Sequence, residues 1–101
     1  MKIDVHETDT TISLKAYGDI EMISIKPFKE KIFEIGQKTN KDVELDLYDV
    51  DYIDSSGIGV LITLLKFQRS KGKNLVINKA SPRVLDVFKL SSLLKIFKLE
   101  V

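Results

Sequence analysis

The sequence predicts an α/β fold in which helices pack against a mixed, mostly parallel sheet. Strand-like segments with alternating apolar and polar residues are interleaved with segments whose apolar residues recur at helical spacing. Two strand-like segments open the chain, and strands then alternate with helices, as in sheets built from strand–helix–strand units. With 101 residues, of which 44% are hydrophobic, the chain suits one domain over residues 1–101 with a four- to five-stranded sheet.

The first two predicted strands, residues 2–7 and 11–17, are expected to form an N-terminal hairpin. In the second strand, Ile12, Leu14 and Ala16 alternate with polar neighbours. Residues 8–10, Thr-Asp-Thr, provide a short connection between the two strands.

The first helix is expected to begin near Pro27. Proline suits the first turn of a helix, because the N–H that it lacks would have no partner there. Phe28, Ile32 and Ile35 then repeat on one face. Gly36 is the predicted stop, since glycine commonly follows the last helical residue.

The middle of the chain is predicted to form a strand, a buried helix and another strand. Residues 43–47 alternate between apolar and acidic side chains, as expected of a strand. Residues 57–71 have a helical pattern that is apolar nearly all round in its first half, which indicates burial against a sheet. Gly72 is expected to end this helix, and the β-rich run at residues 75–77 follows.

A third helix and a last strand are predicted after residue 80. Ser81 is a suitable N-cap, and Pro82 is suited to the first helical position. Residues 96–99 could form a final, short strand.

Composition narrows the range of functions. A formal net charge of +1 argues against a nucleic-acid-binding protein, which normally carries a basic face. The chain has no cysteine, so disulfides and thiolate chemistry are excluded. Its longest apolar run, residues 58–65, is too short to cross a bilayer, and its start lacks the apolar core of a signal peptide. We therefore expect a cytoplasmic protein without a membrane partner.

The most informative segment is the block from Asp51 to Val60, at the predicted junction of a strand and a helix. Ser55 and Ser56 lie at the predicted helix start, where free backbone N–H groups and the positive end of the helix dipole favour a phosphate. The same residues also suit a purely structural role, in which Asp54 or Ser55 is the N-cap.

Two glycines follow the serines. Gly57 and Gly59 keep the helix start uncluttered, so that another protein or a phosphate could approach it. In the structural interpretation, the glycines instead permit tight packing of the helix on the sheet. Both interpretations can hold together.

Clustered carboxylates near this block raise two catalytic or metal-binding alternatives. The aspartates could bind a cation, as in a receiver-like domain that is phosphorylated on aspartate. We favour a solvated acidic rim, because these residues follow one strand and its loop. The sequence argues against a serine hydrolase, because the glycine required two residues before the nucleophile is missing. No metal, cofactor or small-molecule substrate is expected. The aspartates are Asp46, Asp49, Asp51 and Asp54.

At the block Asp-Ser-Ser-Gly-Ile-Gly, residues 54–59, the chain resembles the STAS domain family. More narrowly, it is similar to the stand-alone bacterial anti-sigma factor antagonists. The resemblance implies that the unphosphorylated protein binds an anti-sigma factor, which is also a serine kinase, and so frees a sigma factor. Phosphorylation of Ser55 would end this binding, and a serine phosphatase would reverse the modification. The protein itself would not be an enzyme.

The resemblance also implies a partner-binding surface around the modified serine. Glu21 is expected on it, although many family members carry aspartate at that position, which could alter the polar contacts. The chain ends at Val101, where members often continue into another helix. An alternative role in the same family is a scaffold or accessory subunit of a larger complex, either stressosome-like or transporter-associated. The expected partner-binding residues are Glu21, Asp54, Ser55, Ser56, Gly57, Ile58 and Gly59.

Overall fold

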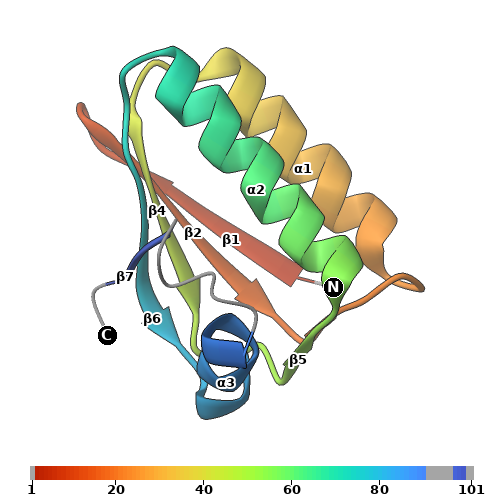
Figure 1. Cartoon of the computed structure of the whole chain (residues 1–101). Coiled ribbons are helices and arrows are strands. Elements are labelled where there is room, and N and C mark those ends of the chain that lie inside the picture. The colour runs from red at the N-terminus through yellow and green to blue at the C-terminus, as the bar shows by residue number, and fades with distance from the viewer. Residues whose placement is uncertain (1, 91–96, 100–101) are drawn as a thin grey trace.

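The structure is a computed structural model that describes residues 2–90 and 97–99 (Figure 1). Within these residues, helices and strands alternate after an initial hairpin, as predicted. The elements are β1 (Lys2–Glu7), β2 (Thr11–Tyr17), β3 (Asp19–Ile20), α1 (Ile25–Lys38), β4 (Asp42–Leu47), β5 (Tyr52–Ile53), α2 (Ser55–Ser70), β6 (Leu75–Ala80), α3 (Pro82–Leu90) and β7 (Lys98–Leu99).

The main sheet has the strand order β1-β2-β4-β6-β7. β1 pairs antiparallel with β2, and the remaining neighbours are parallel. This confirms the predicted mixed, mostly parallel sheet with an N-terminal hairpin. Between β2 and β4, Leu14 lies opposite Leu45, and both are buried. The alternation in these strands therefore places apolar side chains on one face and polar side chains on the other.

Helices α1 and α2 lie side by side across the apolar face of the sheet (Figure 1). The predicted stop at Gly36 is wrong, because α1 continues to Lys38. Gly36 instead allows the two helices to approach closely: a Cβ atom there would lie 2.8 Å from Phe67 Cδ2 and 3.0 Å from Leu64 Cδ1. A glycine required for helix packing has the same local signature as one that ends a helix.

The other predicted helix signals are confirmed. Gly72 follows the end of α2 with a φ of 69°, in the left-handed region that favours glycine. Ser81 precedes α3, and its Oγ accepts a hydrogen bond from Val84 N at 3.3 Å. Pro82 is the first residue of α3. The predicted last strand is found as Lys98–Leu99, and residue 96 lies outside the described part.

A second, two-stranded sheet was not predicted. β3 and β5 pair in parallel, with Asp19 opposite Tyr52 and Ile20 opposite Ile53. Strands of two residues are too short to show an alternating pattern. This small sheet matters because it brings the segment after β3 next to the start of α2.

Candidate functional site

The start of α2 is capped by Asp54. Its Oδ1 atom accepts hydrogen bonds from Ser56 N at 2.9 Å, Gly57 N at 3.3 Å and Ser56 Oγ at 2.5 Å. Of the two N-cap candidates that the sequence offers, Asp54 and Ser55, Asp54 is therefore the N-cap of α2. The hydrogen bond from the Ser56 hydroxyl, together with those from backbone N–H groups, lowers the pKa of Asp54 below its ordinary value, against the opposing effect of burial.

The same carboxylate also joins α2 to the loop between β3 and α1. Asp54 Oδ2 accepts a hydrogen bond from Met22 N at 3.0 Å. The backbone of Asp54 donates to Ile20 O at 3.1 Å. Asp54 therefore fixes two backbone segments to each other, although they lie more than thirty residues apart in the sequence.

The two serines differ in accessibility. Ser56 is half-buried, and its hydroxyl donates to Asp54. Ser55 is exposed, and its hydroxyl has no hydrogen-bond partner within the described residues. Ser55 is thus the hydroxyl that another protein could reach without breaking an existing contact.

The expectation of free amides at this helix start is wrong for two of them. The N–H groups of Ser56 and Gly57 are already satisfied by the Asp54 carboxylate. A phosphate on Ser55 could not use them without displacing Asp54. Both the phosphate and the carboxylate are anions, so the local field of the helix would have to compensate for two negative groups.

The two glycines have different surroundings. Gly57 is buried, and a Cβ atom there would lie 2.5 Å from Ile20 Cγ2 and 2.8 Å from Ile53 Cγ1. Gly59 is exposed, and a Cβ atom there would have nothing within 4 Å. Gly57 thus supports the helix start from inside, whereas Gly59 leaves the surface open.

The remaining predicted partner-binding residues lie near the same helix start. Glu21 is half-buried on the loop that Asp54 holds, and its carbonyl accepts from Ser24 N at 2.9 Å. Ile58 is half-buried in the first turn of α2 and packs against the core. Residues distant in sequence therefore gather at one end of the molecule.

Two of the four clustered aspartates, Asp46 and Asp49, pair with the same lysine. Lys15 Nζ lies 3.3 Å from Asp46 Oδ2 and 2.9 Å from Asp49 Oδ2. The hydrogen bond to Asp49, partly opposed by desolvation and reinforced by Asp46, raises the pKa of Lys15. Asp54 serves as a helix cap instead. Among the described residues, no group of three or more acidic or histidine side chains is arranged to hold a metal ion.

Sequence reasoning missed two apolar residues beside this site. Met22 and Ile23 follow Glu21 on the loop between β3 and α1, and they are 74% and 94% exposed. Neither belongs to a periodic segment, so nothing in the sequence distinguishes them from core residues. The hydrogen bond from Met22 N to the Asp54 carboxylate shows that these two residues border the start of α2.

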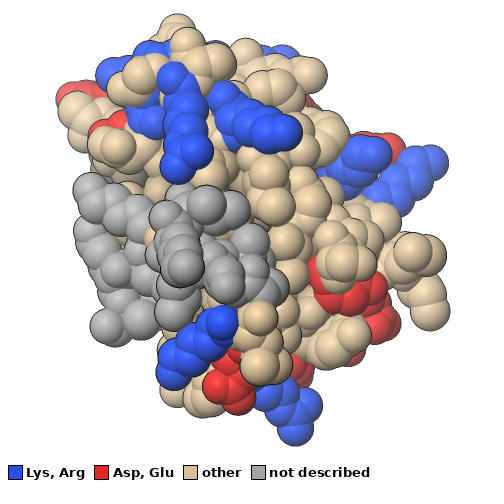
Figure 2. All heavy atoms as spheres, viewed as in Figure 1, with Lys and Arg blue, Asp and Glu red and all other residues tan. Residues whose placement is uncertain are grey.

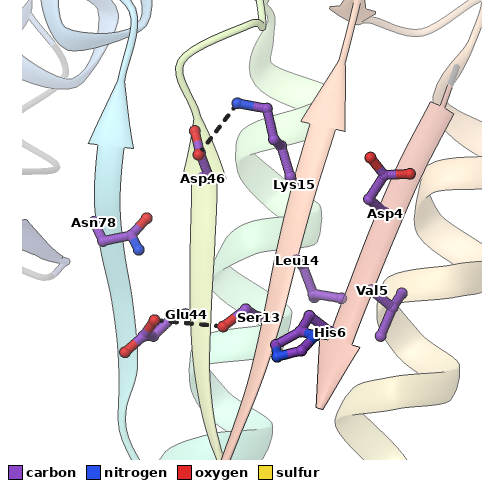
Figure 3. Close-up of a pocket in the computed structure, with 9 residues that line it drawn as sticks. All are labelled: Asp4, Val5, His6, Ser13, Leu14, Lys15, Glu44, Asp46 and Asn78. Carbon is purple, nitrogen blue, oxygen red and sulfur yellow. Dashed lines mark hydrogen bonds and ion pairs between the residues drawn. The ribbon is translucent and has the colours of Figure 1, made fainter. Parts of the chain in front are cut away.

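The polar face of the main sheet carries a hollow of about 180 Å³ (Figure 3). Its lining groups pair with one another: Ser13 Oγ donates to Glu44 Oε2 at 3.4 Å, and Lys15 contacts Asp46. His6 is exposed at this face. Lys15 faces three carboxylates among the lining residues, those of Asp4, Glu44 and Asp46, so the hollow is acidic.

Acidic and basic side chains are unevenly distributed in the view of Figure 2. Acidic side chains lie around the start of α2 and β5, and a group of basic side chains covers the end of the molecule where α2 finishes. Both signs also occur elsewhere on this face. The small net charge of +1 therefore hides an uneven distribution of the two signs on this face.

Comparison with known proteins identifies the family to which this chain belongs. The sequence model of the STAS domain matches residues 2–101, and the chain belongs to this family. The resemblance found in the sequence is thereby confirmed.

Relatives with assigned names agree with the narrower resemblance. The anti-sigma-B factor antagonist of Bacillus subtilis is 27% identical over 93 residues, which cover 92% of this chain and 84% of the relative. That of Staphylococcus epidermidis is also 27% identical, over 92% of this chain and 86% of the relative.

Solved structures show the same fold. A putative anti-sigma factor antagonist from Thermotoga maritima has a TM-score of 0.80 at 26% identity, covering 96% of this chain and 84% of that one. The unphosphorylated anti-sigma factor antagonist SpoIIAA has a TM-score of 0.81 at 17% identity, covering 99% and 89%. Within the described residues of the present chain, no helix has the length and apolar character needed to span a bilayer.

Proposed function

We propose that this protein is an anti-sigma factor antagonist whose binding is switched by phosphorylation of Ser55. The unmodified protein binds an anti-sigma factor that is also a serine kinase, and so frees a sigma factor. The observation that carries the proposal is the exposed hydroxyl of Ser55, which has no hydrogen-bond partner in the described part of the chain and lies at a helix start fixed by Asp54. The names of the relatives support the class of partner.

The physical effect of a phosphate at Ser55 would be electrostatic. It would add about −1.5 to −2 charges. The adjacent N-cap is already anionic, and Asp49 and Asp51 are exposed nearby in the chain. In a desolvated interface, a penalty of about 3 kcal/mol would weaken binding more than a hundredfold.

No refolding is needed for such a switch. Gly57 is packed against Ile20 and Ile53, so the backbone beneath Ser55 is already fixed. We expect the protein to act in the cytoplasm as a kinase substrate, with a serine phosphatase that resets it and no catalysis of its own. No nucleic acid, membrane, metal or small-molecule substrate is required.

The first test is to map phosphorylation sites on the protein purified from its native cells. Phosphate is expected on Ser55 and should be absent from Ser55→Ala. Ser56→Ala is the matched control, because it removes the neighbouring hydroxyl and should leave Ser55 modified. An unmodified Ser55 under all growth conditions would contradict the proposal.

The second test is the affinity of the purified chain for the anti-sigma factor kinases of its source organism, measured by calorimetry. Ser55→Ala should bind with the affinity of the unmodified protein, and Ser55→Asp should bind at least a hundredfold more weakly. Equal binding by both variants would refute the switch. Stable association with a larger complex whatever the state of Ser55 would favour the scaffold role instead.

A further inference from the structure

Two large apolar side chains protrude beside the proposed phosphorylation site. Met22 and Ile23 are 74% and 94% exposed on the loop between β3 and α1. A single exposed apolar side chain is ordinary on a protein surface. These two are adjacent, and the exposed Tyr52 lies on β5, which pairs with the strand preceding their loop. Together they give the region around Ser55 an apolar character that its acidic neighbours would not predict.

The loop that carries these side chains is held in place by hydrogen bonds. Met22 N donates to Asp54 Oδ2 at 3.0 Å. Ser24 Oγ donates to Asp19 O at 2.9 Å, and Ser24 N donates to Glu21 O at 2.9 Å. The backbone on both sides of Ile23 is therefore fixed. A side chain presented on a fixed backbone loses less entropy on binding than one on a free loop.

From this arrangement we propose that Met22 and Ile23 are the apolar anchor by which the chain binds its anti-sigma factor. The inference rests on the proposed function and names the residues that supply the contact. Asp54 holds both the anchor and the start of α2, so one partner surface would cover the anchor and Ser55 together.

The surroundings define the chemistry of the partner. The anchor is bordered by acidic residues on the side of β3 and β5, namely Asp19, Glu21 and Asp51, and by Lys26 on the side of α1. A complementary surface on the anti-sigma factor is an apolar pocket with basic groups at its rim. The pocket would exclude water from Met22 and Ile23, and the basic groups would pair with the acidic rim. A phosphate on Ser55 would then act within this same interface.

The anchor is tested with the anti-sigma factor that binds the unmodified chain. Met22→Ser and Ile23→Ser should each weaken binding about tenfold, and the double variant should weaken it about a hundredfold. Met22→Leu and Ile23→Val should bind nearly as the parent chain does. The matched control is Leu90→Ser, because Leu90 is 88% exposed at the end of α3 and lies outside the proposed anchor.

A measurement on the unsubstituted chain avoids any effect of the variants on folding. The chain contains two methionines, Met1 and Met22. Dilute hydrogen peroxide should oxidise Met22 in the free protein, and the anti-sigma factor should slow this oxidation at least tenfold. Oxidation of Met1 in the same sample provides the internal reference.

The outcomes separate this inference from the proposed function. If the double variant binds as tightly as the parent while Ser55→Asp does not bind, the anchor is wrong and the switch stands. Unchanged oxidation of Met22 in the complex would also overturn the anchor. If the unmodified chain binds no anti-sigma factor, the proposed function and the anchor fail together.

Discussion

The two ends of α2 are built in opposite ways. At its start, the backbone is held tightly by the Asp54 cap and by the packing of Gly57, and the side chain of Ser55 is left exposed. At its end, by contrast, side chains are buried inside the molecule. Gln68 is fully buried, and its Nε2 donates to Lys41 O and to Asn74 O, both at 2.9 Å.

The end of α2 also binds the end of α1. Lys71 Nζ donates to Gly36 O at 2.5 Å and to Thr39 O at 2.6 Å, which satisfies carbonyls at the end of α1. Burial lowers the pKa of this lysine. The proposed binding surface is therefore held as firmly as the structural contact at the other end of the helix. The difference is that at the start of α2 the backbone is the part that is held, and the side chains remain accessible to a partner.

Among the substitutions that test the difference between the two ends of α2, Gly57→Ala is expected to have the largest effect on stability. The new Cβ atom would lie 2.5 Å from Ile20 Cγ2 and 3.1 Å from Ile20 O, so the helix start must shift. We expect a loss of about 2–3 kcal/mol in the free energy of unfolding. Urea denaturation measures this loss, and calorimetry should show weaker binding to the anti-sigma factor at a temperature where the variant is folded.

Gly59→Ala is the matched control for this substitution. A Cβ atom at Gly59 would meet nothing within 4 Å. Replacing glycine within a helix should then raise stability by up to about 1 kcal/mol. If both alanine variants lost the same stability, the fixed backbone at the start of α2 would not be explained by packing at Gly57.

A smaller effect is expected from Gln68→Leu at the other end of α2. Leucine keeps the bulk of the side chain but removes the donor to Lys41 O and one of two donors to Asn74 O, which also accepts from Val43 N at 3.0 Å. We expect a loss of about 2 kcal/mol in unfolding free energy, measured in urea. The exposed Gln37→Leu, on α1, should change stability by less than about 0.5 kcal/mol. Affinity for the anti-sigma factor should not change in either variant, and a loss in Gln68→Leu would contradict the division between the two ends.

The smallest effect is expected from Asp54→Asn, which should lower the free energy of unfolding by about 1 kcal/mol at pH 7. Asparagine can still cap a helix, but it loses the charged acceptor that Ser56 and Met22 use. The pKa of Asp54 is lowered in the folded protein, so the carboxylate stabilises the fold above the ordinary pKa of about 4. This contribution is lost as the pH falls through the lowered value.

The measurement for this variant is the unfolding free energy of the parent and Asp54→Asn in urea at several pH values between 7 and 3. The difference between the two proteins should shrink as the pH falls below about 4. A difference that stays constant over this range would show that the charge of Asp54 is not what stabilises the helix start.

Much of the fold could be predicted because its signals are local. A few neighbouring residues are enough to predict each of three features. These are the alternation in β2 and β4, the proline in the first turn of α1 (Pro27) and the serine before α3 (Ser81). Gly36 misled the prediction because its role depends on Phe67, a residue of another helix. The strands β3 and β5 were missed because two residues carry no period.

For the candidate site, the sequence by itself determined the positions of the two serines, the capping group and the glycines, because these residues lie together in one block at a helix start. The tertiary structure decided which serine is accessible and which glycine is buried. It also decided that Met22 belongs beside Ser55. The reason is that the Asp54 carboxylate and the pairing of β3 with β5 join segments that are far apart in the chain. The sequence of either segment alone does not indicate such contacts.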